Sequence, residues 1–110
     1  MAKVGVIFAQ GFEEVEGLTP VDVLRRAKME CDMIGLKDQT VTGSHAIPVL
    51  MDKVFDGSLS DYDMIVLPGG LPGAHHLRDH EGLIAALQKE ATARKYIATI
   101  FAAPVVLHRA

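Results

Sequence analysis

Several residue types are scarce in this sequence, and each scarcity excludes a class of protein. One cysteine among 110 residues excludes a small scaffold held together by disulfides. No apolar run approaches the roughly 20 residues that span a bilayer, so we expect no membrane partner. Tryptophan is absent, the net charge is −3 and no basic stripe occurs, which argues against binding to nucleic acid. The opening residues, Met1 to Val4, lead straight into an apolar segment without a signal peptide, so we expect a cytoplasmic location.

Apolar sequence, by contrast, is abundant for a chain of this size. Hydrophobic residues make up 49% of the chain, which excludes a disordered protein. The length suits one domain over residues 1–110. A domain this small cannot bury so much apolar surface alone, so we expect a partner subunit or a further part of the domain.

Strand-like and helix-like segments alternate along the chain. Continuous apolar runs predict strands that are covered on both faces, whereas apolar residues at helical spacing predict helices. This alternation predicts an α/β fold with a doubly wound, mostly parallel sheet and helices on both faces. The predicted strands cover residues 3–9, 30–36, 63–67 and 96–101, the helices cover 13–27 and 80–94, and an edge hairpin covers 39–42 and 47–51.

Three local features refine this expectation. The first helix begins either near Glu14, with a kink at Pro20, or at Pro20 itself with Thr19 as its N-cap. Asp79 is the expected N-cap of the second helix. A last helix has barely begun when the sequence ends at Ala110, so we expect residues 1–110 to be the N-terminal part of a longer domain, with a sheet incomplete at its C-terminal side.

Ligands of such sheets bind beyond the carboxyl ends of the strands, where the loops 10–16, 68–73 and 101–104 are predicted to lie. In the second loop, the backbone N–H groups of Gly69 and Gly70 suit an oxyanion hole, although Pro-Gly-Gly is also common in plain turns.

The first loop leads into a cluster of acidic residues. Glu13, Glu14 and Glu16 are explained most simply as carboxylates that compensate the dipole of the following helix. Glu13 and Glu16 share a helix face and Glu14 points elsewhere. One of these acids is nevertheless placed to act as a buried acid at the end of a central strand.

The third loop has the form of a nucleophile elbow, with small residues after its first position. That first position is Phe101, which has no nucleophilic atom. Cys31 lies in a predicted strand and is interpreted as a small buried hydrophobe. His76 and His80 have the spacing of a helical metal-binding pair, but no third ligand is evident, so we expect solvated histidines, no metal and no cofactor.

Four motifs occur in order along the chain. They are G-F-E-E-V-E over residues 11–16, T-P-V-D-V-L-R-R-A over 19–27, Y-D-M-I-V-L-P-G-G over 62–70 and I-F-A-A-P over 100–104. Together they resemble the ThiJ/PfpI family over the whole chain. That resemblance implies a flavodoxin-like, class I glutamine amidotransferase-like fold, in most members a homodimer.

The resemblance also assigns a site. Glu16 matches the family's buried glutamate, and Gly69 and Gly70 match the glycine pair beside its oxyanion site. Ala102 matches the residue whose N–H follows the nucleophile, and Phe101 stands where the family has cysteine. On this reading Glu16 and Phe101 lie at the carboxyl ends of central strands and face one crevice.

The implied family activities are glyoxalase or deglycase action on reactive carbonyls, peptidase or amidase hydrolysis, and stress-response or chaperone roles. Thiolate chemistry cannot proceed at Phe101, so we expect the cysteine-dependent activity to be lost. The resemblance also implies a histidine near the cysteine, at a position that would follow residue 110. The alternative is a non-catalytic module that keeps the family pocket for a small carbonyl or peptide-like ligand.

A nucleotide-binding role is less well supported, because the acidic loop 10–16 offers no group of backbone N–H donors for phosphate. Phe101 is open to three explanations: an engineered or sequencing change, a natural pseudoenzyme, or a truncated fragment of a gene.

Overall fold

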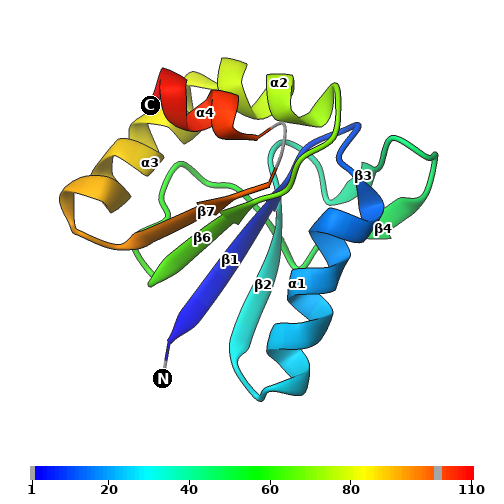
Figure 1. Cartoon of the computed structure of the whole chain (residues 1–110), viewed down its shortest axis with the longest axis horizontal. Helices are drawn as coiled ribbons and strands as arrows, with labels where there is room; N and C mark the ends of the chain where they lie inside the picture. The colour runs from blue at the N-terminus through cyan, green and yellow to red at the C-terminus, as the bar shows by residue number, and fades with distance from the viewer. Residues whose placement is uncertain (1, 101–102) are drawn as a thin grey trace.

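A five-stranded sheet forms the centre of the protein, in a computed structural model that describes residues 2–100 and 103–110 (Figure 1). Its strands lie in the order β5-β2-β1-β6-β7, and all four pairings are parallel. A separate antiparallel hairpin consists of β3 (Thr40–Thr42) and β4 (Pro48–Leu50). The predicted doubly wound, mostly parallel α/β fold is confirmed. The sheet strands are β1 (Lys3–Phe8), β2 (Glu30–Gly35), β5 (Lys53–Val54), β6 (Met64–Leu67) and β7 (Tyr96–Thr99).

Helices cover both faces of this sheet (Figure 1). Helix α1 (Glu14–Arg26) and the hairpin pack on one face, and α2 (Gly73–Asp79), α3 (Glu81–Thr92) and α4 (Pro104–Arg109) pack on the other. Strand β1 contributes side chains to the hydrophobic clusters on both faces, which explains why its sequence is continuously apolar rather than alternating. Among the described residues, no helix combines the length and the apolar composition needed to cross a membrane.

Helix α1 starts at the earlier of its two predicted positions. The Glu13 carboxylate caps the helix by accepting a hydrogen bond from the backbone N–H of Val15, at 2.9 Å. The helix then runs through Pro20 to Arg26. The missing N–H of Pro20 removes one hydrogen bond from the helix, and the packing of α1 on the sheet offsets that loss.

One expectation about local structure is wrong. Residues 73–79, for which no helix was predicted, form helix α2, so Asp79 ends one helix instead of capping the next. His80 caps α3 in its place, because its Nδ1 accepts a hydrogen bond from the N–H of Leu83. Among the described residues, no strand pairs with the outer side of β7.

Candidate functional site

The loops that follow β1 and β6 pack against each other at the carboxyl end of the sheet. The backbone N–H of Glu13 donates a hydrogen bond to the carbonyl oxygen of Gly69, at 3.0 Å. Gly70 has a φ of +93°, and a Cβ atom at this position would lie 2.4 Å from the backbone nitrogen of Glu13. Only glycine satisfies both the positive φ and this close approach. The Gly69-Gly70 turn therefore lies directly against the start of α1.

Glu16 lies in the first turn of α1, one helical turn after Glu13. Its side chain is half-buried, and Oε1 is buried without a hydrogen-bond partner among the described residues. A buried carboxylate oxygen without a partner is costly, and in native proteins such an atom often has a functional reason. Glu16 is thus the one acid of the cluster 13–16 whose environment is incomplete.

The turn after β7 is described at its two ends. The N–H of Ile100 bonds to the carbonyl oxygen of Leu67, at 3.1 Å, and the N–H of Ala103 bonds to the carbonyl oxygen of Ile100, at 2.7 Å. The first bond places Ile100 beside Leu67, the last residue of β6, immediately before the Pro68-Gly69-Gly70 loop. Phe101 and Ala102, which the sequence assigned to the site, lie outside the described residues, and their roles stay predictions.

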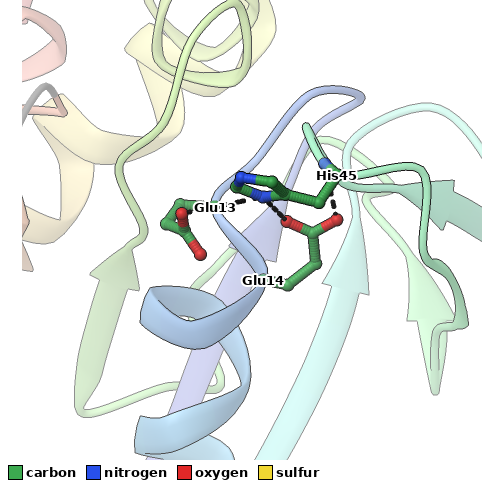
Figure 2. Close-up of side chains that lie close together, drawn as sticks. All are labelled: Glu13, Glu14 and His45. Atoms are coloured by element: carbon green, nitrogen blue, oxygen red, sulfur yellow. Dashed lines mark hydrogen bonds and ion pairs between the residues drawn. The ribbon is translucent and has the colours of Figure 1, made fainter.

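Glu14 is the most constrained acid at this end of the sheet, and no sequence pattern indicated its role (Figure 2). The residue is only 5% exposed. Its carboxylate accepts hydrogen bonds from the N–H of His45, at 2.8 Å, and from the N–H of Ile47, at 3.4 Å, and its Oε1 lies 2.9 Å from His45 Nδ1. A Cβ atom on Gly43 would lie 2.3 Å from the Glu14 carboxyl carbon, so this glycine makes room for it. Glu14 therefore fastens the hairpin to α1.

Hydrogen bonding controls the charge of this pair. Burial by itself would raise the pKa of Glu14, but the hydrogen bonds from the His45 side chain and from the backbone lower that pKa to about 2. The hydrogen bond to Glu14 and the charges of Glu14 and Glu13 raise the pKa of His45. Glu14 consequently stays ionised at neutral pH, and the proton of His45 is held more firmly than in free histidine.

The single cysteine lies far from these loops. Cys31 is the second residue of β2 and pairs with Val4, near the amino end of the sheet. It is buried, and burial raises its pKa, which disfavours the reactive thiolate. The interpretation of Cys31 as a small buried hydrophobe is confirmed.

A cavity of about 230 Å³ opens at the carboxyl ends of β1 and β2. Its lining mixes apolar residues with polar and charged ones, among them Asp38, His76 and His80. His76 and His80 do not share one helix, because α2 ends at Asp79. Glu16, Gly69 and Gly70 do not line this cavity.

Comparisons with known proteins agree on one family. Residues 2–110 match the model of the DJ-1/PfpI family. The chain is 34% identical over 105 residues to the Parkinson disease protein 7 homolog of Danio rerio, an alignment that covers 93% of this chain and 56% of that protein. Its fold matches the structure of oxidized Toxoplasma gondii DJ-1 with a TM-score of 0.92 and 38% identity, covering 98% of this chain and 60% of that one.

The structure of Drosophila melanogaster DJ-1beta also matches with a TM-score of 0.92, at 36% identity, covering 99% of this chain and 60% of that one. The sequence therefore spans less than two thirds of the length of these relatives. The family model covers nearly every residue, and the sheet, the loops and the helices follow the same fold. The chain belongs to the DJ-1/PfpI family.

Proposed function

We propose that this chain is a non-catalytic member of its family, which keeps the crevice of Glu16, Gly69 and Gly70 and binds a small carbonyl or peptide-like ligand there. The cysteine-dependent reaction on carbonyls, peptides or amides that the resemblance implies is absent. One observation carries the proposal: the chain's only cysteine, Cys31, is buried at the opposite end of the sheet, and the elbow position is Phe101.

The chemistry explains why this exchange removes the activity. In a cysteine-dependent reaction the thiolate sulfur adds to the carbonyl carbon, and the carbonyl oxygen takes up the negative charge beside backbone N–H groups. A phenyl ring has no lone pair with which to form that bond. Gly69 and Gly70 still offer backbone N–H groups to a carbonyl oxygen, so ligand binding does not require the sulfur.

Loss of methylglyoxal from solution, followed by proton NMR, tests the catalytic half of the proposal. The purified chain and a thiol-free Cys31→Ser variant should both match the buffer control. Turnover that disappears in Cys31→Ser would make Cys31 the working thiol, and turnover in both proteins would reveal chemistry that needs no thiol. Either result would overturn the proposal.

Amide chemical shifts test the binding half, with pyruvate as a small carbonyl probe. We expect shifts at the Gly69 and Gly70 amides that saturate with pyruvate, and no shift at Gly57, which lies in a different loop. If the Gly69 and Gly70 amides do not move at millimolar pyruvate, the crevice does not bind this class of ligand.

We also propose that the chain forms a homodimer. Large hydrophobic side chains are exposed on α1 and on the adjoining hairpin, which Glu14 holds together. Burying these side chains against a second copy would remove them from water. Sedimentation at micromolar concentration should give a dimer, whereas a stable monomer would contradict the proposal. On these two elements the exposed residues are Val15, Val23, Ile47 and Leu50.

A further inference from the structure

Three potential metal ligands from two separate elements meet where α1 begins (Figure 2). One atom from each of Glu13, Glu14 and His45 lies within 4.8 Å of the other two. The two carboxylates come from the start of α1, and the imidazole comes from the turn of the β3–β4 hairpin. We propose that these three side chains form a binding site for a divalent transition-metal ion of the Zn²⁺ type, independent of the proposed carbonyl-binding crevice.

The distances suit a four-coordinate ion. His45 Nδ1 lies 2.9 Å from Glu14 Oε1 and 3.8 Å from Glu13 Oε2. Ligand atoms about 2.0–2.1 Å from a tetrahedral ion stand about 3.3 Å apart, so the two observed distances bracket the required one. Small rotations of the side chains would bring all three atoms to one ion, and water would complete the coordination.

The ligand atoms are already oriented by contacts on their far sides. Glu13 Oε1 accepts the N–H of Val15, at 2.9 Å, and Glu14 Oε2 accepts the N–H of His45, at 2.8 Å. Each carboxylate therefore has one oxygen fixed by the backbone and the other available near the imidazole. Such outer contacts are what orient the ligands of natural metal sites.

The position of Glu13 distinguishes a metal site from a hydrogen bond that only joins the hairpin to α1. The hydrogen bond between Glu14 and His45 fastens the hairpin without any help from Glu13. At 3.8 Å, Glu13 Oε2 is too far from Nδ1 for a hydrogen bond, yet its carboxylate reaches the same ring nitrogen as Glu14 Oε1, from the other side (Figure 2). A metal ion would engage both carboxylates at once.

Charge and ligand type define the class of ion. Two carboxylates offer a charge of −2, which outweighs the partial positive charge of the helix N-terminus. An ion at Nδ1 displaces the proton that this nitrogen shares with Glu14, so binding releases a proton. The imidazole nitrogen favours Zn²⁺, Cu²⁺, Ni²⁺ or Co²⁺ over Mg²⁺ and Ca²⁺, which prefer oxygen ligands. The His45 side chain is 67% exposed, so an ion can reach Nδ1 from solvent.

Titration of the whole chain with Co²⁺, followed by its visible absorption, tests the site, with Zn²⁺ as competitor. We expect one Co²⁺ per chain, displaced by Zn²⁺ and not by an equal concentration of Mg²⁺. Glu13→Gln and His45→Gln should each weaken binding by about tenfold or more. His75→Gln, which removes an exposed histidine on α2, is the matched control and should leave the affinity unchanged.

Histidine ring NMR with Zn²⁺ gives a second readout that needs no variant. The His45 ring resonances should shift first, and the pattern should identify Nδ1 as the bound nitrogen. Absence of binding, an affinity that Glu13→Gln leaves unchanged, or a first shift at another histidine would each overturn the proposal. Glu13→Gln retains an oxygen for the Val15 N–H, so the helix cap and the fold should survive the substitution.

Discussion

Gly70→Ala probes the contact on which the crevice depends. Gly70 combines a φ of +93° with a position directly against α1, where a Cβ atom would lie 2.4 Å from the backbone nitrogen of Glu13. Gly57 provides a matched control, because it has a similar φ of +101° but nothing within 4 Å of its Cβ position. Alanine at Gly57 introduces backbone strain alone, whereas alanine at Gly70 adds a steric clash with backbone.

The expected costs follow from these two environments. A non-glycine residue at positive φ costs about 1–3 kcal/mol, and both variants should lose that amount of stability. At Gly70 the loop must also move away from α1, which disrupts the hydrogen bonds from the N–H of Glu13 to Gly69 and from the N–H of Ala74 to Gly70. Two such bonds contribute about 1–3 kcal/mol together. Gly70→Ala should therefore be less stable than Gly57→Ala by about 1–3 kcal/mol.

Urea unfolding of the two variants and the parent chain, monitored by circular dichroism, measures this difference. Any gain from stiffening the unfolded chain is the same for both glycine-to-alanine changes and cancels in the comparison. Equal free energies of unfolding for Gly70→Ala and Gly57→Ala would refute the claim that the loop after β6 packs against the start of α1.

Two further substitutions test buried polar groups of the sheet and α3. Tyr62→Phe removes the hydroxyl that donates to Asp32 Oδ2 at 2.6 Å, and should lower the free energy of unfolding by about 1–2 kcal/mol in urea; no change would mean that water replaces the bond fully. Burial raises the pKa of Glu90, with Lys95 opposing the shift. The folded state therefore keeps this proton to higher pH than the unfolded chain, and stability falls as the pH rises above 4.5. Glu90→Gln should remove that fall, so its stability relative to the parent should be greater at pH 7 than at pH 4, and parallel pH curves would contradict the assignment.

Elements that a local pattern of apolar and polar residues marks out were predictable from the sequence. The apolar runs of β1 and β6 predicted strands buried on both faces, and the polar turn around Gly43 predicted the hairpin. The helix predicted over 80–94 is present as α3, with Leu83, Ile84 and Leu87 buried and Ala91 exposed. The four motifs predicted the family, and the family comparisons confirm it.

Contacts between distant residues were not predictable in the same way. The partnership of Glu14 with His45 joins positions 31 apart, and each residue alone has an ordinary explanation on a helix or in a turn. Helix α2 was missed because it is short and begins next to Pro72 and Gly73, which are typical of loops.

Methylglyoxal consumption by Phe101→Cys, with and without Glu16→Gln, tests the central claim most directly. If Glu16 and residue 101 share one crevice, Phe101→Cys should consume methylglyoxal while the parent chain does not. Adding Glu16→Gln should then reduce that rate by about a hundredfold or more, as expected for loss of an acid–base group. A folded Phe101→Cys chain without activity, or one whose rate is indifferent to Glu16→Gln, would contradict the assignment of this crevice.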